Sequence, residues 1–449
     1  MQKILLLGSG GREHAMGAAL VRGGDAQLFV AMNDANPGLM RLATAHRRTE
    51  SNAAEIIAFC KEQKIDFCVS GPEKPLADGI TDALTAAGFP CASPSRAAAQ
   101  IETSKIFMRQ LLDRHRVDGQ IKYIQTARAE EAIAFAESQN WRVAVKPVGL
   151  TGGKGVKVWG DHFSDPQHVR DDIAEILTQG ISGHHQAVIE ELLEGQEFTL
   201  HFYCDGKHAI PSPLIQDHKR AYDRDRGPNT GGMGAYSCEN GLLPFVSQAD
   251  YDAAAAIGPQ VVRAMAAEGT PFHGVLYGQF MMTRSGPRII EFNARFGDPE
   301  AINALSVLDS SYVDICRSMI EGTLRPDMFA FRPVATLLLY VVPPGYGTSP
   351  VADTPLIIDE AAIRRAGAVP YYASCNFQSE TNGLVSITTT RSRTLGLFAE
   401  GATLEAARTR VLDAVKTIKG HFAHRTDIGA PDVLAAKMAQ MMHLRQRVA

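Results

Sequence analysis

The sequence has no long hydrophobic run, no strong net charge and no paired cysteine motif. Its longest apolar stretch, 334–342, is interrupted by Thr336 and has about half the length of a transmembrane helix. There are 45 basic and 49 acidic residues, so the formal net charge of −4 excludes an overall basic field for nucleic acid or an anionic membrane. The seven cysteines, never spaced as C-x-x-C, indicate neither a disulfide framework nor a zinc site. The apolar run 4–7 is too short for a signal peptide. We therefore expect a cytoplasmic protein without nucleic-acid or membrane partners.

The composition is otherwise that of a globular protein with several domains. Hydrophobic residues make up 45% and charged residues 21% of the 449 residues, a length that predicts about two to four domains. Apolar runs alternate with helical patterns in the first hundred residues, which is typical of an α/β domain with a doubly wound parallel sheet. Ligands of such sheets bind at the carboxyl ends of the strands. The first glycine turn, at residues 8–11, and Gly71-Pro72-Glu73 both follow predicted strands.

Two further regions follow a break at Ser93-Pro94-Ser95. The pattern is helical over 97–114, and a β-rich block, a long polar loop over 217–237 and a strand pair over 275–293 follow. From residue 331 onward the chain reads as short strands and turns, with helices near 404–418 and 432–447. We expect domains at 1–103, 104–330 and 331–449.

Three glycine-rich segments are candidates for binding phosphate. Residues 8–13 lie between a strand and a helix, where free amides suit an anion, although Glu13 occupies the third glycine position of a dinucleotide fingerprint; the alternative is a tight turn that binds nothing. Residues 149–155, with Lys146 and Lys154, could fold over a triphosphate or form a mobile hairpin with solvated lysines. Residues 217–220 and 229–234 lie in the long polar loop, which is either ordered by ligand contacts or a disordered surface loop.

The strand pair at 275–293 contains the most specific group of candidate site residues. Pairing residue 283 with 287 puts Gln279 opposite Glu291 and on the same face as Asn293, while Ile290 and Phe292 point to the apolar face. Three oxygen-bearing side chains on one face suit Mg²⁺; the alternative is a solvated face. Asp298 and Pro299, which follow, are expected to be the N-cap and first residue of a helix.

Together these motifs resemble the phosphoribosylamine–glycine ligases (glycinamide ribonucleotide synthetases), ATP-grasp enzymes of purine biosynthesis. The resemblance covers nearly the whole chain. It implies an N-terminal doubly wound parallel sheet, a central ATP-grasp domain with a mobile lid subdomain at about 121–195, and a small β-rich α+β C-terminal domain. The motifs that carry it, in the family's order, are residues 8–14, 71–73, 216–220, 227–237, 290–300 and 424–429.

The resemblance also implies a reaction and a set of site residues. Glycine and 5-phosphoribosylamine would be joined at the expense of ATP, through a glycyl phosphate, with Mg²⁺ or Mn²⁺ as cofactor and no covalent enzyme nucleophile. The catalytic residues would be Arg295, Asp217 and Lys219. ATP would be bound by Lys105, Lys146, Gly152, Gly153, Lys154, Glu190, Glu191, Leu193 and Glu197, with Glu197 at the ribose. Substrates would be bound by Gly10, Gly11, Arg12, Glu13, Pro72, Glu73, Asn229, Thr230, Gly231 and Gly232. The metal ligands would be Gln279, Glu291 and Asn293.

The alternatives are another ATP-grasp ligase acting on a different carboxylate and amine, a nicotinamide-dependent oxidoreductase, and a non-catalytic nucleotide-binding regulator. The motifs at 71–73 and 217–220 argue against the first, Glu13 against the second, and Glu291, Asn293 and Arg295 against the third. Common bacterial members of the family differ at 147–155 and lack Gln279. The segment after Gly429 is longer than expected for the family and has no assigned role. We expect a monomer or weak homodimer.

Overall fold

The N-terminal domain confirms the predicted doubly wound parallel sheet. The computed structural model describes residues 1–148, 156–180 and 185–446, and its first four strands pair in parallel in the order β3-β2-β1-β4. The strands are β1 (Gln2–Leu7), β2 (Ala26–Ala31), β3 (Ala43–Arg47) and β4 (Phe67–Ser70). The helices are α1 (Gly11–Val21), α2 (Pro37–Leu42), α3 (Ala53–Gln63), α4 (Glu73–Asp78) and α5 (Ile80–Ala86). The short element pair α2 and β3 is absent from the sequence-based expectation.

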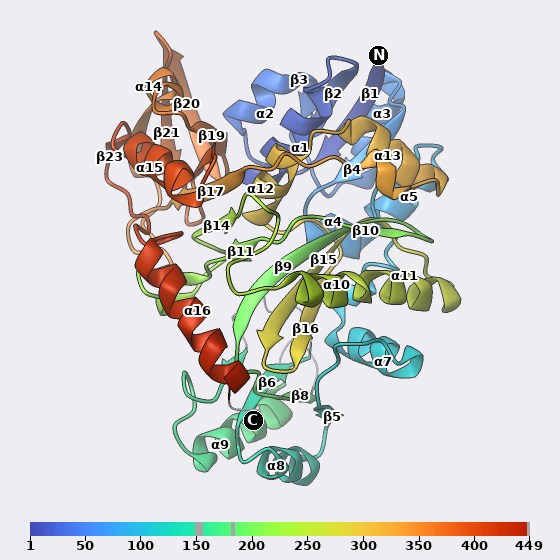
Figure 1. Ribbon diagram of the computed structural model, residues 1–449. Coiled ribbons are helices and arrows are strands. Elements are labelled where there is room, and N and C mark those ends of the chain that lie inside the picture. The colour runs from blue at the N-terminus through green and yellow to red at the C-terminus, as the bar shows by residue number, and fades with distance from the viewer. Residues whose placement is uncertain (149–155, 181–184, 447–449) are drawn as a thin grey trace.

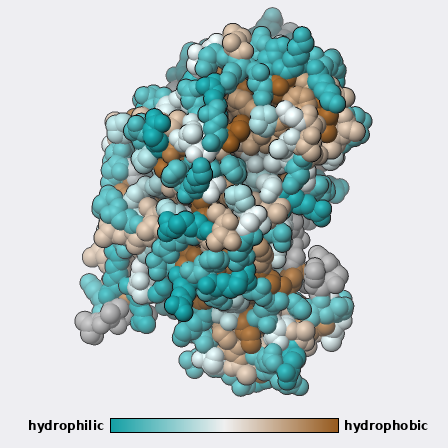
Figure 2. All heavy atoms as spheres, turned by 90° about the vertical axis from the view of Figure 1, so that its right-hand side faces the viewer, coloured by the Kyte–Doolittle hydropathy of each residue, from teal (hydrophilic) through white to brown (hydrophobic). Residues whose placement is uncertain are grey.

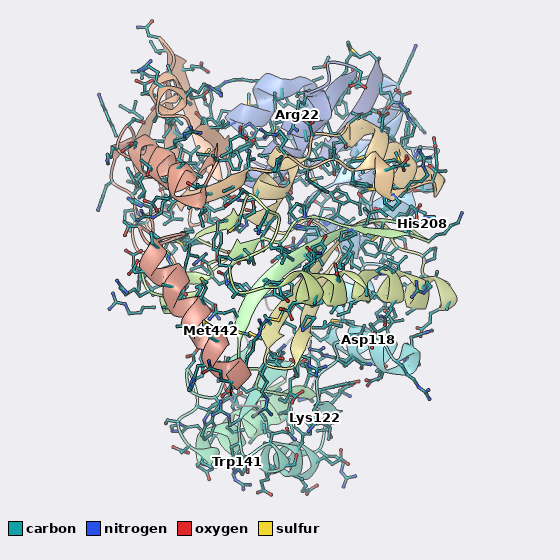
Figure 3. The ribbon with its side chains drawn as sticks, in the orientation of Figure 1. Arg22, Asp118, Lys122, Trp141, His208 and Met442 are labelled. Atoms are coloured by element: carbon teal, nitrogen blue, oxygen red, sulfur yellow. The ribbon has the colours of Figure 1, made fainter. Side chains whose placement is uncertain are left out.

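A small sheet with its own hydrophobic core forms the lower block in Figure 1. Its strand order is β5-β8-β6-β7, and Figure 3 shows Lys122 and Trp141 in this block. Its elements are β5 (Tyr123–Thr126), α8 (Ala129–Ser138), β6 (Val143–Pro147), β7 (Lys157–Val158), α9 (Pro166–Gln179) and β8 (Ala187–Glu191). The predicted glycine loop at 149–155 lies outside the described residues. Lid motion of 121–195 stays a prediction.

The central antiparallel sheet, with the order β10-β9-β15-β16, lies between this block and the N-terminal domain (Figure 1). It consists of β9 (Gln196–Asp205), β10 (Ala209–Pro211), β15 (His273–Thr283) and β16 (Gly286–Asn293). Associated helices are α6 (Gln100–Thr103), α7 (Lys105–His115), α10 (Gln248–Ala255), α11 (Ile257–Ala267), α12 (Glu300–Val307), α13 (Tyr312–Glu321) and the 3-10 turn η1 (Pro326–Met328). Ser104 accepts a hydrogen bond from the amide of Phe107 and begins α7, so the helix expected over 97–114 is two helices.

The N-terminal domain is joined to this central part by packing of α1 against α12. Arg22, labelled in Figure 3, follows α1 and donates hydrogen bonds to the carbonyls of Leu305 (2.8 Å) and Leu308 (2.6 Å). These carbonyls lie at the end of α12, where no further helical turn can satisfy them. The guanidinium therefore closes the helix and fastens the two domains together.

Strands from the central and C-terminal regions share one sheet, of order β11-β14-β17-β22-β19. These are β11 (Gln216–Asp217), β14 (Gly234–Ser237), β17 (Ala335–Val341), β19 (Val369–Tyr372) and β22 (Leu395–Gly401). The expected loop over 217–237 is thus largely strand, with β12 (Arg220–Tyr222) paired to β13 (Arg226–Asn229). The predicted boundary at 330/331 falls between strands of this shared sheet, and the domain limits stay a prediction.

A second C-terminal sheet, of order β20-β21-β18-β23, and three helices complete the chain. The strands are β18 (Pro355–Asp359), β20 (Cys375–Thr381), β21 (Leu384–Thr389) and β23 (Lys419–Gly420), and the helices are α14 (Glu360–Arg365), α15 (Leu404–Val415) and α16 (Pro431–Gln446). In Figure 1, α16 leaves the C-terminal block and runs obliquely along the edge of the central sheet.

The register of the β15–β16 hairpin corrects one detail of the sequence analysis. Gln279 lies opposite Glu291 as predicted, but Thr283 pairs with Gly286 rather than with residue 287. A bulge in β16 explains why both pairings hold. Gln279 pairs with Glu291, but the next residue of β15, Phe280, pairs with Ile289. Ile289 is therefore the fully buried core residue, and Ile290, expected on the apolar face, is only half-buried. An extra residue shifts the side-chain alternation by one, which periodicity alone does not reveal.

Asp298 is not the helix N-cap that the sequence suggested. Pro299 has that position before α12. The Asp298 carboxylate instead accepts a hydrogen bond from the Tyr340 hydroxyl (2.6 Å) and forms an ion pair with Arg393 (3.2 Å). The tertiary partners of a charged residue outweigh its capping preference here.

The face shown in Figure 2 is mostly hydrophilic, with scattered apolar side chains. In the described part of the chain no helix combines the length and apolar character needed to cross a membrane.

The glycine turn after β1 is packed around one carboxylate. Glu13 is buried, accepts a hydrogen bond from the Gly10 amide (2.7 Å), and pairs with Arg12 (2.6 Å). A Cβ on Gly71 would lie 2.1 Å from Glu13 Oε1, and one on Gly8, which has φ +118°, 2.4 Å from Glu13 Cγ. These glycines are required because the side chain of Glu13 occupies the space beside them.

We expect Gly71→Ala to lower the free energy of unfolding by about 1–3 kcal/mol, because the added methyl group overpacks a fixed, buried carboxylate. Urea unfolding followed by circular dichroism measures it. Gly23→Ala is the matched control, since its Cβ would meet only the end of the Asp25 side chain, at 3.0 Å. Equal effects of the two substitutions would contradict the packing argument.

Candidate functional site

A buried cluster of three charged side chains links the small sheet to the central sheet. Glu190, on β8, pairs with Lys146 on β6 (2.5 Å) and with Arg109 on α7 (2.8 Å). Arg109 also donates hydrogen bonds to the carbonyls of Ile289 (3.3 Å) and Ile290 (2.9 Å) at the β16 bulge. Burial alone would raise the pKa of Glu190, but Arg109 and Lys146 outweigh it and hold that pKa below its usual value. The cluster carries excess positive charge, which suits phosphate groups.

A second charged group lies at the start of β9. The Glu197 carboxylate accepts hydrogen bonds from Gln279 (2.5 Å) and from Lys219 (3.2 Å), and its side chain is 46% exposed. Burial would raise the pKa of Glu197, but Lys219 and Gln279 lower it. Glu197 is therefore an anionic acceptor with free lone pairs at the edge of the site.

A pair of acidic side chains lies deeper, where β11 meets α12. Glu300 is buried and accepts hydrogen bonds from Tyr277 (2.9 Å) and Thr199 (3.1 Å). Among the described residues, Asp217 Oδ1 is buried without a hydrogen-bond partner. Burial, followed by repulsion from Glu300, raises the pKa of Asp217. An unpaired acceptor beside a second carboxylate is suited to an ammonium group of a ligand.

Arg295 connects the central sheet with the N-terminal domain. It pairs with Glu102 (3.0 Å) and with Glu73 (3.4 Å), while Arg12 lies 3.8 Å from the same Glu73 carboxylate. Burial would lower the pKa of Arg295, but Glu102 and Glu73 raise it, so the guanidinium stays charged. Arg295, followed by Arg12 in order of effect, lowers the pKa of Glu73 to about 2 against the opposing effect of burial. Two cations and two carboxylates thus meet at the domain junction.

The predicted substrate-binding turn lies beside this junction. Arg12 is buried and donates a hydrogen bond to the Phe296 carbonyl (3.1 Å), and Pro72 lies against the Gly8 turn. The Glu13 carboxylate already accepts the hydrogen bond of the Gly10 amide. The direct role of Glu13 is therefore to support the turn. Gly11 approaches the Tyr340 hydroxyl so closely that a Cβ would lie 2.4 Å from it.

The segment Asn229–Gly232 folds over Lys219. The Thr230 amide and hydroxyl both donate hydrogen bonds to the Lys219 carbonyl at 2.8 Å. Gly232 has φ +105°, and a Cβ there would lie 2.8 Å from Asp217 Oδ1. Arg393 donates hydrogen bonds to the carbonyls of Gly231, Gly232 and Asp298. Asn229 is exposed. The glycines therefore allow this segment to approach Asp217 closely.

The other predicted nucleotide residues lie around the first cluster. Lys105 begins α7, and burial followed by the charge of Lys146 lowers its pKa, although Glu291 opposes this. Glu191 Oε1 accepts a hydrogen bond from the Lys122 amide (2.8 Å), and Leu193 is half-buried just after β8. Gly152, Gly153 and Lys154 lie outside the described residues.

The hairpin face offers a donor set that fits a hard divalent cation. Glu291 and Asn293 are alternate residues of β16, and Gln279 lies opposite Glu291. The amide nitrogen of Gln279 is bonded to Glu197, which leaves its oxygen for other partners. The Glu291 carboxylate lies near enough to Lys105 and Lys219 to act on the pKa of both lysines. Within the described ranges, no cluster of three His, Cys, Asp or Glu side chains forms an alternative metal site. One carboxylate and two amide oxygens are ligands that Mg²⁺ accepts.

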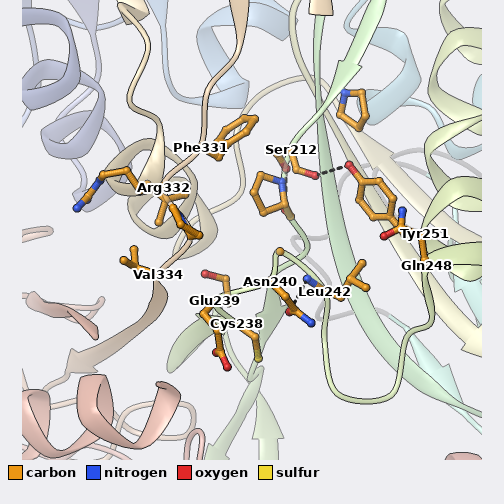
Figure 4. A pocket seen from close by; sticks show the side chains of 16 residues that line it. Ser212, Cys238, Glu239, Asn240, Leu242, Gln248, Tyr251, Phe331, Arg332 and Val334 are labelled. Atoms are coloured by element: carbon orange, nitrogen blue, oxygen red, sulfur yellow. Dashed lines mark hydrogen bonds between the residues drawn. The ribbon is translucent and has the colours of Figure 1, made fainter. Parts of the chain in front are cut away.

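Two cavities lie away from these residues. One, of about 360 Å³, lies between the 211–213 and 237–242 segments and the chain at 331–334 (Figure 4). Tyr251 lines it and donates a hydrogen bond to the Ser212 carbonyl (3.2 Å). The other, of about 300 Å³, lies beside the β12–β13 turn. Neither is lined by a predicted site residue, so the charged clusters, and not the enclosed cavities, identify the candidate site.

Several residues in these clusters escape the sequence analysis. Glu300 lies within the 290–300 motif, and its place in that motif could have identified it as a site residue. Arg109 is a charged residue between Met108 and Leu111 on the buried face of α7, which could also have been noticed. Glu102, Arg393 and Lys437 carry no local sequence signal, because only the tertiary fold brings them to the site.

Comparisons with known proteins agree with this geometry. Sequence models for the N domain and the ATP-grasp (A) domain of phosphoribosylglycinamide synthetase match residues 2–102 and 103–301. The phosphoribosylamine–glycine ligase of Methanothermobacter thermautotrophicus is 41% identical, covering 99% of this chain and 100% of the relative. That of Methanoregula boonei is 43% identical, covering 98% and 100%. The crystal structure of the Thermotoga maritima phosphoribosylamine–glycine ligase superposes with a TM-score of 0.78 at 22% identity, covering 95% of this chain and 100% of that one.

The Glu73–Arg295 pair generates a pH-dependent prediction. The pKa of Glu73 is depressed in the folded state, so the stabilisation is present above about pH 4.5 and is lost as the pH falls towards 2. We expect Glu73→Gln to reduce the free energy of unfolding by about 1 kcal/mol at pH 7, a value discounted because the side chain is 44% exposed. The difference should shrink on acidification.

Thermal unfolding at pH 7 and at successively lower pH measures this difference. Glu130→Gln, which removes an exposed carboxylate on α8, is the control and should change the unfolding free energy by less than about 0.5 kcal/mol at either pH. A Glu73→Gln deficit that grows on acidification would contradict the assignment.

Proposed function

The chain belongs to the phosphoribosylamine–glycine ligase family, and from that premise we propose a role for each of its site residues. It is an ATP-grasp ligase that joins glycine to 5-phosphoribosylamine, giving glycinamide ribonucleotide, ADP and phosphate in purine biosynthesis. ATP is used with a divalent metal ion. The observation that carries the residue assignment is the buried Asp217 Oδ1, which has no hydrogen-bond partner among the described residues and can accept from an ammonium group. Arg295, a buried cation paired with Glu102, supplies the positive charge that a carboxylate needs.

Glycine lies between these groups, with its carboxylate near Arg295 and its ammonium near Asp217. The buried, unpaired oxygen of Asp217 supports the ammonium position, and Glu300 adds negative charge beside it. A Cβ on Gly232 would lie 2.8 Å from Asp217 Oδ1, and one on Gly297 would lie 2.5 Å from Glu300 Oε2, so both glycines let the main chain pass close to the two carboxylates. Lys219 offsets the charge of the pair and orients it.

The reaction then proceeds in two displacements. A carboxylate oxygen of glycine attacks the γ-phosphorus of ATP and the bond to the β-phosphate oxygen breaks, which gives glycyl phosphate and ADP. The amine nitrogen of phosphoribosylamine attacks the glycyl carbonyl carbon, loses a proton, and inorganic phosphate leaves with the acyl oxygen. Both displacements require positioning and charge neutralisation by the enzyme more than a covalent nucleophile. Arg295 holds the acyl phosphate between the two.

ATP binds between the small sheet and the central sheet, where Lys146 and Glu190 face Arg109. Lys105, Lys146 and Lys154 neutralise phosphates, residues 190–193 including Glu191 and Leu193 border the adenine, and Glu197 binds the ribose hydroxyls. The exposed lone pairs of Glu197 support this role. Glu291, Asn293 and Gln279 would hold the metal ion, Mg²⁺ or Mn²⁺, and the ion would supply positive charge at the phosphates. Gly152 and Gly153, outside the described residues, remain predicted ATP-binding residues.

Phosphoribosylamine binds at the domain junction. Gly10, Gly11, Arg12, Pro72 and Glu73 border it on the N-terminal side, with Glu13 as support, and the segment 229–232 closes the opposite side. The enzyme acts in the cytoplasm as a monomer or weak homodimer, without nucleic-acid or membrane partners. The excess of acidic residues supports the absence of a nucleic-acid partner.

Substrate dependence tests the reaction. Because the glycyl phosphate is reactive towards water, the enzyme should couple ATP cleavage to capture by the amine in a closed site. We expect ADP release at full rate only with both glycine and freshly prepared phosphoribosylamine, and we expect alanine, which adds a methyl group, to be a poor substitute for glycine. Equal ADP release with neither substrate present would rule out the ligase assignment.

The metal face is tested by Glu291→Gln. This change keeps the volume and removes the only formal charge among the three ligands, so turnover should fall on the order of 10²-fold or more. Gln279→Ala should cost less, because water can replace a neutral ligand of Mg²⁺. Neither change should alter the melting temperature much without nucleotide. Near-normal turnover of an unstable Glu291→Gln protein would make Glu291 structural.

A further inference from the structure

The C-terminal helix α16 sends one cation into the interior beside the site. Lys437 has a side chain only 11% exposed, whereas Met438 and Met442 on the same helix are 41% and 61% exposed. Figure 3 marks Met442 on the lower part of the helix. Lys437 Nζ donates hydrogen bonds to Gln216 Oε1 (3.1 Å) and His218 Nε2 (3.4 Å) and lies 3.9 Å from Asp225.

The two residues that Lys437 contacts alternate along the chain with two predicted catalytic residues. Side chains of an extended strand point alternately to opposite faces. Gln216 and His218 therefore lie on the side of α16, and Asp217 and Lys219 lie on the side of the substrates. The contacts of Lys437 fix the back of the strand whose front carries Asp217 and Lys219.

Gln216 also connects Lys437 to Glu197. The Gln216 side-chain amide donates a hydrogen bond to the Glu197 carbonyl (2.8 Å), while its oxygen accepts from both Lys437 and the Tyr236 hydroxyl (2.7 Å). A glutamine with all these bonds has little freedom to rotate. The main chain at Glu197 is thus held at a fixed distance from α16.

A second contact from α16 reaches the neighbouring residue on β9. Gln440, one turn after Lys437, accepts a hydrogen bond from the side chain of Gln196. The helix is itself held at its start by Arg224–Asp432 (2.8 Å) and near its end by Arg445–Asp250 (2.7 Å). Contacts on both sides of Glu197 therefore come from one anchored helix.

We propose that α16 is a strap for the nucleotide site and that Lys437 is a positioning residue that, through Gln216, sets the Glu197 carboxylate for the ribose hydroxyls of ATP. This gives a role to the segment after Gly429. It rests on the proposed function only in the assignment of Glu197 to the ribose.

The strap proposal is tested by measuring how strongly the enzyme prefers a nucleotide that carries the ribose hydroxyls. We would measure kcat/KM for ADP release with ATP and with 2′,3′-dideoxy-ATP, at saturating glycine and phosphoribosylamine. A charged carboxylate that binds the hydroxyls should give a preference for ATP of about 10-fold or more in the unmodified enzyme. Lys437→Met, which keeps the length and removes the charge, should lower this preference by about 3–10-fold. A merely structural defect would lower both kcat/KM values in the same proportion.

Three further variants make the result decisive. Lys416→Met is the matched control, because it removes an exposed lysine that pairs with Asp413 at the end of α15, and it should keep the preference of the unmodified enzyme. Gln440→Ala, at an exposed position, should lower the preference by a smaller factor than Lys437→Met. If Lys437→Met does not fold, the preference measured for Gln440→Ala tests the strap proposal instead. Glu197→Gln should bring the preference close to 1.

The outcomes distinguish the strap proposal from the assignment of Glu197 to the ribose. If Glu197→Gln loses the preference while folded Lys437→Met keeps it, the strap proposal is overturned and the ribose assignment stands. If Lys437→Met does not fold and Gln440→Ala keeps the preference, the strap proposal is likewise overturned. If Glu197→Gln keeps the preference, the ribose assignment fails, and the strap proposal fails with it, although ADP release still tests the ligase reaction separately.

Discussion

Compensation of buried charge between distant segments is the constraint on which this structure depends. Arg109 on α7 meets Glu190 on β8, Arg295 after β16 meets Glu102 and Glu73, and Arg425 meets Asp225 and Asp427. Removing one partner of a fully buried pair such as Arg109 and Glu190 leaves an uncompensated charge, which costs about 3–5 kcal/mol. Removing a half-exposed partner such as Glu73 costs less, because water screens the charge that is left. The segments are therefore held in the one arrangement in which each cation finds its carboxylates. The candidate site lies among the same pairs, so its geometry and the stability of the domain junctions have a common origin.

The bulge in β16 shows how backbone geometry serves this constraint. It keeps Ile289 in the core while Glu291 and Asn293 remain on the polar face opposite Gln279. A bulge interrupts the regular ladder, and carbonyls released from it need donors. Arg109 supplies them for Ile289 and Ile290 and at the same time holds Glu190. One guanidinium thus couples the register of the metal face to the position of the phosphate-binding cluster.

The sequence predicts those features that depend on local pattern. Alternation of apolar runs and helices was sufficient for the parallel sheet of the N-terminal domain, and the spacing of Gln279, Glu291 and Asn293 was sufficient for their common face. The bulge was missed because an inserted residue has no signature in periodicity, and the role of Asp298 was missed because Tyr340 and Arg393 are distant in sequence. Glu102 and Lys437 were missed for the same reason. Long-range partners of charged residues are decided by the fold, which no local pattern specifies.

The pairing of lysines with carboxylates has a consequence for nucleotide binding. Lys146 and Lys219 are already paired, with Glu190 and Glu197, so they are held in defined positions before ATP arrives. Pairing weakens the attraction of each lysine for phosphate, but it removes much of the cost of ordering a long side chain. Two cations, Arg109 and Lys146, contact Glu190, and Lys105 lies near enough for Glu291 to attract it and Lys146 to repel it. The phosphates of ATP relieve that repulsion, so the cluster favours the nucleotide without requiring its lysines to abandon their carboxylate.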